Sequence, residues 1–123
     1  MNFEIGQAAE ITRSYTVDDM TDFARQAGLE GAAPETVPGP LIGALFSYLL
    51  GVKLPGRGTN YLKQEMRFLE GAPIGTPLTA KVKITKLRPE KHLVDLETTC
   101  TAADGTRVCE GRALVYIEDV GKG

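Results

Sequence analysis

The chain has 123 residues, of which 42% are hydrophobic and 24% charged, and this composition is typical of one globular domain spanning residues 1–123. Its 14 Lys and Arg and 16 Asp and Glu give a net charge of −2, so no nucleic-acid or anionic-lipid partner is expected. The longest apolar stretch, residues 41–52, is far shorter than the roughly 20 residues of a helical membrane span, and no basic leader opens the chain. A cytoplasmic location is therefore expected.

The first third of the chain predicts a strand and a short helix. The strand covers residues 10–15. Thr16 and Asp19 have the spacing of a helix N-cap, and the amphipathic helix that follows is expected to end at Gly28. Residues 29–38 are small, acidic and proline-bearing, and they predict a loop.

A second helix is predicted between Pro40, which suits a first turn, and Gly51, where helices tend to stop. Its apolar side chains cover nearly the whole circumference, so it must be enclosed on all sides. After it the apolar residues recur at every second position, which predicts strands. In the first of them Leu62 and Gln64 share one face while Tyr61 lies on the other.

Four such strands, residues 61–68, 78–84, 94–100 and 106–117, are expected to form an antiparallel meander. The last two close around Asp104-Gly105, which places Cys100 opposite Cys109 and Glu97 opposite Arg112. Facing thiols are expected to stay reduced in a cytoplasm, although the geometry allows a disulfide. No Cys/His spacing in the sequence suggests a metal site.

Together the elements predict an α+β protein in which a curved antiparallel sheet of about five strands wraps around a central apolar helix, the hotdog architecture. One small sheet cannot cover such a helix on every side, and its edge strand stays unpaired. We therefore expect at least a dimer, with the two sheets joined edge to edge.

Two segments, Gly39–Gly51 and Leu54–Gln64, make the chain resemble the MaoC-like hotdog proteins, and among these the (R)-specific enoyl-CoA hydratases, over residues 10–117. The resemblance implies an acyl thioester of CoA or of an acyl carrier protein, bound near the amino terminus of the second helix, and no other cofactor. Unpaired N–H groups and the helix dipole would stabilise negative charge on the thioester oxygen there. The resemblance assigns substrate binding to Gly39, Pro40, Leu41, Ser47, Tyr61 and Gln64.

Some of these residues also have a purely structural explanation. Pro40 contributes no N–H, and Pro-Gly-Pro is also an ordinary helix-starting turn. Ser47 can bond to its own helix backbone. Gln64 falls on an apolar strand face and needs a buried partner, which a ligand carbonyl would provide.

The catalytic segment of the family, Gly-Asp-x-Asn-Pro-x-His, has no match here. Leu29 stands at the Gly-Asp step, Pro38 precedes the helix glycine where the family often has histidine, and the only histidine, His92, falls in a later turn where exposure is expected. The resemblance therefore implies a thioester-binding protein without hydratase activity, as a homodimer or as the non-catalytic subunit beside an active hydratase.

Two alternatives stay open. A single carboxylate of the shortened loop, Glu30 or Glu35, would serve as the base of an acyl-CoA thioesterase, although solvated loop glutamates are common. Alternatively the space that the resemblance assigns to the acyl chain is filled by large side chains such as Phe46, Tyr48 and Met66, and the chain is a ligand-free assembly module.

Overall fold

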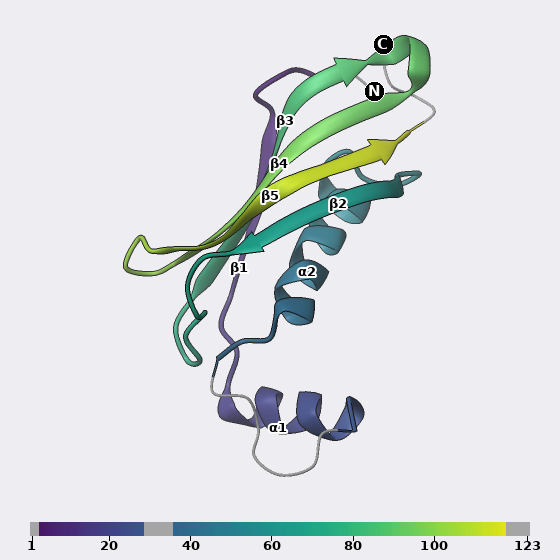
Figure 1. Cartoon of the computed structure of the whole chain (residues 1–123). Coiled ribbons are helices and arrows are strands. Elements are labelled where there is room, and N and C mark those ends of the chain that lie inside the picture. The colour runs from purple at the N-terminus through teal and green to yellow at the C-terminus, as the bar shows by residue number, and fades with distance from the viewer. Residues whose placement is uncertain (1–2, 29–35, 118–123) are drawn as a thin grey trace.

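A computed structural model describes residues 3–28 and 36–117, in which a five-stranded antiparallel sheet curves around one helix (Figure 1). This arrangement confirms the predicted α+β fold. None of the helices in these two ranges is long and apolar enough to span a bilayer. The elements are β1 (Ala8–Arg13), α1 (Val17–Gln26), α2 (Gly39–Tyr48), the π-helical turn η1 (Leu49–Lys53), β2 (Asn60–Phe68), β3 (Leu78–Arg88), the 3-10 turn η2 (Pro89–Lys91), β4 (Leu93–Ala102) and β5 (Arg107–Tyr116).

The strand order is β1-β3-β4-β5-β2, so the predicted four-strand meander is wrong for β2. Strands β3, β4 and β5 are consecutive neighbours, whereas β2 pairs with β5 at the edge of the sheet (Figure 1). The connection from β2 to β3 does not close a hairpin, because its backbone forms hydrogen bonds with residues that precede α2. Val37 N–H donates to the Ala72 carbonyl at 2.9 Å, and Gly75 N–H donates to the Tyr15 carbonyl at 2.7 Å.

Two strands differ in detail from the prediction. Strand β1 is Ala8–Arg13 rather than residues 10–15, because Arg13 already pairs with Leu78, the first residue of β3. In β2 a bulge between Tyr61 and Lys63 shifts the register. As a result Tyr61 pairs with the buried Val115 on the inner face, and Leu62 is 55% exposed instead of facing inward.

The hairpin of β4 and β5 has the predicted register, with Cys100 opposite Cys109 and Glu97 opposite Arg112. Both thiols are buried and free. Burial raises the pKa of Cys100 to about 11 and raises the pKa of Cys109 as well, so both remain protonated and unreactive.

Helix α1 begins with the predicted cap. Thr16 Oγ1 accepts the Asp19 N–H at 3.1 Å, and the Asp19 carboxylate accepts the Thr16 N–H at 2.8 Å. The helix ends where predicted, since Gly28 has a φ of 72°, a left-handed conformation that favours glycine.

This cap predicts an acid-sensitive contribution to stability. The backbone hydrogen bond from Thr16 lowers the pKa of Asp19 in the folded state. A depressed folded pKa stabilises the protein above the unfolded value, about 3.9, and the contribution is lost as pH falls through the folded pKa. Below about pH 4 the unfolding free energy of the wild type should therefore fall more steeply than that of Asp19→Asn. Urea unfolding over a pH series measures this, and parallel profiles would contradict it.

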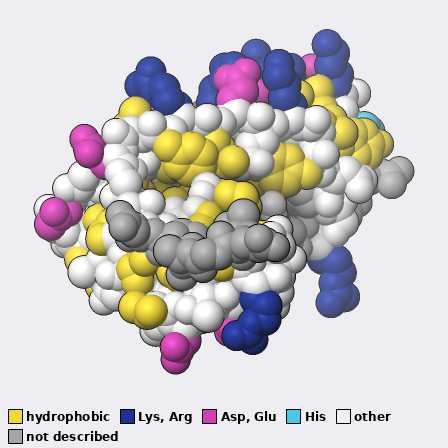
Figure 2. All heavy atoms as spheres, turned by 60° about the horizontal axis from the view of Figure 1, so that its bottom comes forward, with side chains coloured by type: hydrophobic (Ala, Val, Ile, Leu, Met, Phe, Trp, Pro, Cys, Tyr) yellow, Lys and Arg dark blue, Asp and Glu magenta, His cyan; other side chains and the backbone are white. Residues whose placement is uncertain are grey.

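Helix α2 lies on the concave side of the sheet and packs Ile42, Leu45 and Phe46 into the core. The helical path does not stop at Gly51 but continues through η1, where Leu54 N–H donates to the Leu49 carbonyl at 2.8 Å. The opposite side of α2 is exposed at Pro40, Ala44, Ser47 and Tyr48. The helix is thus not enclosed on all sides by its own sheet, and Figure 2 shows hydrophobic side chains gathered on the face seen there.

The outer face of the sheet, the side away from α2, carries mixed charge. The cations of the outer face are Lys63, Arg67, Lys81, Lys83, Lys86, Arg88, Arg107 and Arg112, and its carboxylates are Glu10, Glu65, Asp95, Glu97 and Glu110. Cations and carboxylates alternate across neighbouring strands, as in the register Lys83, Glu97, Arg112. Such alternation favours a stable, solvated sheet surface.

Candidate functional site

A cavity of about 360 Å³ lies at the amino terminus of α2. One wall is the entry to the helix and its first turn, and the other wall is the end of β2 with the connection to β3. The lining residues are Thr36, Val37, Pro38, Gly39, Ile42, Phe68, Glu70, Gly71 and Ala72. Of the residues that the sequence assigned to binding, Gly39 lines this cavity, and Pro40 and Leu41 follow it in the first turn of α2.

The first turn of α2 offers few free N–H groups. Pro38 is the N-cap, and its carbonyl accepts the N–H groups of Leu41 at 3.1 Å and Ile42 at 3.4 Å. Pro40 has no N–H. Among the described residues, no acceptor is found for the Gly39 N–H. The positive end of the helix dipole and this one amide therefore form the electrophilic part of the cavity.

Phe68, which the sequence reasoning did not assign to the site, covers the first turn. A β-carbon at position 39 would lie 2.9 Å from the Phe68 Cζ, so glycine allows the ring to rest against the helix. One turn further along α2, Met66 packs on Gly43, where a β-carbon would lie 3.4 Å from the Met66 Cε. The inner-face position of Phe68 was evident from its alternation, but its contact with Gly39 depends on tertiary packing.

Glu70 supplies a carboxylate to this cavity, and its side chain is exposed. The two carboxylates named from the sequence, Glu30 and Glu35, lie outside the described residues. Glu70 was not singled out because a glutamate next to a Gly/Pro turn carries no signal of its own.

The only histidine lies at the other end of the sheet. His92 follows η2 with a φ of 58°, and its ring contacts that of Tyr116 at a centroid distance of 5.6 Å. Tyr116 pairs with Asn60, the first residue of β2, whereas Phe68, the last, rests on Gly39. Nine strand residues separate these ends by about 26 Å. The predicted turn is confirmed, but His92 is partly buried rather than exposed.

Ser47, Tyr61 and Gln64 do not line the cavity at Gly39. Ser47 lies on the exposed side of α2, and the other two lie on the inner face of β2. In the described part of the chain, the Tyr61 hydroxyl and Gln64 Nε2 are shielded from solvent without a hydrogen-bond partner. Burial raises the pKa of Tyr61 to about 12, so its hydroxyl remains a potential donor.

The large side chains of the ligand-free alternative do not act together. Phe46 is buried in the core, Tyr48 is 44% exposed, and Met66 packs on Gly43. None of the three lines the cavity at the amino terminus of α2. That cavity is therefore not filled by these residues.

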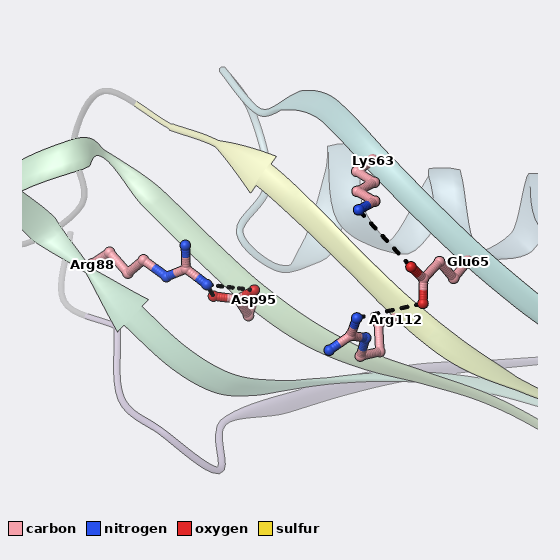
Figure 3. Close-up of polar contacts among 5 residues, drawn as sticks. All are labelled: Lys63, Glu65, Arg88, Asp95 and Arg112. Carbon is pink, nitrogen blue, oxygen red and sulfur yellow. Dashed lines mark hydrogen bonds and ion pairs between the residues drawn. The ribbon is translucent and has the colours of Figure 1, made fainter.

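A smaller hollow of about 170 Å³ lies on the outer face. Figure 3 shows the polar contacts among five of the residues that line it. Arg88 pairs with Asp95 at 3.0 Å, while Glu65 lies 3.4 Å from Arg112 and 3.9 Å from Lys63. Both carboxylates are thus held in ion pairs of the sheet surface. Within residues 3–28 and 36–117 no group of three His, Cys, Asp or Glu side chains is placed to hold a metal ion.

Comparison with known proteins gives the family. The (R)-specific enoyl-CoA hydratase of Aeromonas caviae is 32% identical over 129 residues, covering 94% of this chain and 96% of that protein. The chain belongs to the (R)-specific enoyl-CoA hydratase family. The solved (R)-hydratase from A. caviae has a TM-score of 0.84 at 29% identity and covers 94% of this chain and 97% of that chain, which confirms the predicted hotdog fold.

Other members of the hydratase family match with different coverage. The (R)-specific enoyl-CoA hydratase of Rhodospirillum rubrum is 43% identical over 79 residues, covering 64% of this chain but only 54% of that protein. The mitochondrial 3-hydroxyacyl-[acyl-carrier-protein] dehydratase FERN of Solanum lycopersicum is 26% identical over 129 residues, covering 93% of this chain and 77% of that protein. No protein-family model matches the chain.

Proposed function

We propose that this member of the hydratase family binds an acyl thioester of CoA or of an acyl carrier protein in the cavity at Gly39 and does not hydrate it. The observation that carries the proposal is the position of the only imidazole, which lies beside Tyr116 and so near the first residue of β2, whereas the last residue of β2 rests on the first turn of α2. The names of the relatives include a CoA thioester and an acyl-carrier-protein thioester, so the proposal includes both carriers.

Among the residues that the structure describes, the cavity has groups for binding rather than for hydration. The Gly39 N–H and the helix dipole favour the thioester oxygen, and Val37, Ile42 and Phe68 offer apolar walls to the carbons beside it. Adding water to a double bond needs one group to activate the water and another to protonate carbon. Glu70 supplies at most one of these roles.

An assay with crotonyl-CoA and butyryl-CoA tests the proposal. The chain alone is expected to bind butyryl-CoA in a calorimetric titration and to leave the enoyl absorbance of crotonyl-CoA at its background rate. The A. caviae enzyme serves as the active control. Turnover by this chain near that of the control would contradict the absence of hydratase activity, and failure to bind butyryl-CoA would contradict the site.

Glu70 beside the helix terminus favours a second candidate, thioester hydrolysis, because one carboxylate can activate water against a polarised carbonyl. Under this candidate the wild type releases free thiol from butyryl-CoA, and Glu70→Gln lowers that rate about 100-fold. Glu90→Gln, the same change in the distant η2 turn, is the matched control. Absence of thiol release from the wild type rules the candidate out.

We further propose a homodimer formed through α2 and the free edge of β2. Three large apolar side chains on this side are exposed, Tyr48 at 44%, Val52 at 60% and Leu62 at 55%. Light scattering should give a dimer for the wild type and a monomer for Leu62→Arg, while Val17→Arg on α1 leaves the dimer intact. A monomeric wild type would contradict the homodimer, and its association with an active hydratase would instead support the non-catalytic subunit.

A further inference from the structure

We infer that the outer face of the sheet docks an acidic acyl carrier protein, whose phosphopantetheine arm reaches the cavity around the end of β2. The inference rests on the proposed function for the cavity itself. Its first support is the distribution of charge. The outer face has three more cations than carboxylates, whereas the whole chain has a net charge of −2, so the rest of the chain has a net charge of −5.

The excess of positive charge extends to the end of β2 that borders the cavity. Arg67 and Arg107 share one carboxylate, with Glu110 at 2.8 Å from Arg67 and 3.8 Å from Arg107. The Arg67 side chain is 74% exposed and that of Arg107 is 45% exposed. One carboxylate balances one of the two guanidinium groups, which leaves the pair with a net positive charge and donors free for an anion.

The same strand end joins this pair to the candidate site. Arg67 immediately precedes Phe68, and successive strand residues point to opposite faces. Arg67 therefore faces outward while the Phe68 ring lies against Gly39 in the cavity. A phosphate at Arg67 and Arg107 can continue into a thioester-bearing arm that passes the end of β2 at Phe68 and enters the cavity there.

The charge extends well beyond what one phosphate would contact. At the opposite end of the outer face, Lys63, Arg88 and Arg112 outnumber the carboxylates Glu65 and Asp95 (Figure 3). Figure 2 shows Lys and Arg side chains, with Asp and Glu side chains among them, along the upper rim of that view, above the hydrophobic side chains. A broad, weakly positive surface suits an acidic protein, because complementary potentials over a large area raise the rate of encounter and fix orientation.

The test compares three ligands that share the butyryl thioester. Butyryl-pantetheine has no phosphate, butyryl-CoA adds small-molecule phosphates, and a butyryl-loaded acidic carrier protein adds the protein surface. We expect the wild type to bind the carrier about tenfold more tightly than butyryl-pantetheine at low salt and to lose most of this advantage at high salt.

Charge reversal locates the surface. Arg67→Glu combined with Arg107→Glu should weaken carrier binding about tenfold and leave butyryl-pantetheine binding unchanged. Arg25→Glu combined with Lys91→Glu makes the same change in net charge in α1 and η2, at residues outside the outer-face set, and should alter carrier binding less than about twofold.

Each other outcome is decisive. Equal weakening for the carrier and for butyryl-CoA would show that the arginines bind a phosphate only and would overturn the docking surface. A carrier bound no more tightly than butyryl-pantetheine would also overturn it. If the wild type binds the carrier with the expected dependence on charge but does not bind butyryl-pantetheine, the docking surface stands and the proposed cavity fails.

Discussion

Gly111→Ala is expected to destabilise the protein by about 3 kcal/mol or more, a large share of the roughly 5–15 kcal/mol that keeps a small domain folded. Gly111 pairs with Met66, and a β-carbon there would overlap the Glu65 carbonyl oxygen and lie 3.0 Å from the Met66 Cα. These are backbone atoms, so no side-chain rotation relieves the clash. Strand β2 would have to move away from β5, and Phe68 would move with it.

Urea unfolding followed by circular dichroism measures this effect, and Gly51→Ala is the matched control. Nothing lies within 4 Å of a β-carbon at Gly51, and its backbone does not require glycine. Alanine there should be neutral or stabilise the helical turn by up to about 1 kcal/mol. Equal stability of the two variants would contradict the close pairing of β2 with β5.

Phe46→Ala should cost about 3 to 5 kcal/mol because it leaves a cavity between α2 and the sheet. Phe46 is fully buried and belongs to the cluster formed by α2 and the inner face of the sheet. The same cluster holds Ile42, which lines the cavity at Gly39, so loosening it should also weaken butyryl-CoA binding.

Tyr48→Ala provides the comparison for Phe46→Ala. Both are aromatic residues of α2, but Tyr48 is 44% exposed and should cost about 1 kcal/mol or less in the monomer. Unfolding is therefore best measured at a concentration where both variants are monomeric. A larger loss for Tyr48→Ala than for Phe46→Ala would contradict the orientation of α2.

The sequence predicted which segments form strands and helices better than it predicted how they pair. The cap formed by Thr16 and Asp19 depends on neighbouring residues, and so does the register across Asp104-Gly105; both are confirmed. Alternation shows which face of a strand is buried but not which strand lies beside it. The place of β2 next to β5 depends on distant backbone contacts of its connection, such as Val37 with Ala72.

The candidate site was predictable only in part, for the same reason. Gly39 was singled out because the helix start resembles that of the hydratases. Phe68 and Glu70 come from the end of β2 and the connection after it, and only the tertiary structure brings them to Gly39. The bulge at Leu62 was not predictable either, because the alternation of apolar and polar residues is compatible with a regular strand as well as with one whose register shifts.

The most direct test of the account is the response of the Gly39 amide to a thioester. In a ¹H–¹⁵N correlation spectrum, titration with butyryl-CoA should shift the Gly39 resonance more than that of Gly51, and butyramide or free CoA should not reproduce the shift. Large shifts at Gly39 specific to the thioester are the predicted result. Binding of butyryl-CoA with an unmoved Gly39 resonance would contradict a thioester site at the amino terminus of α2.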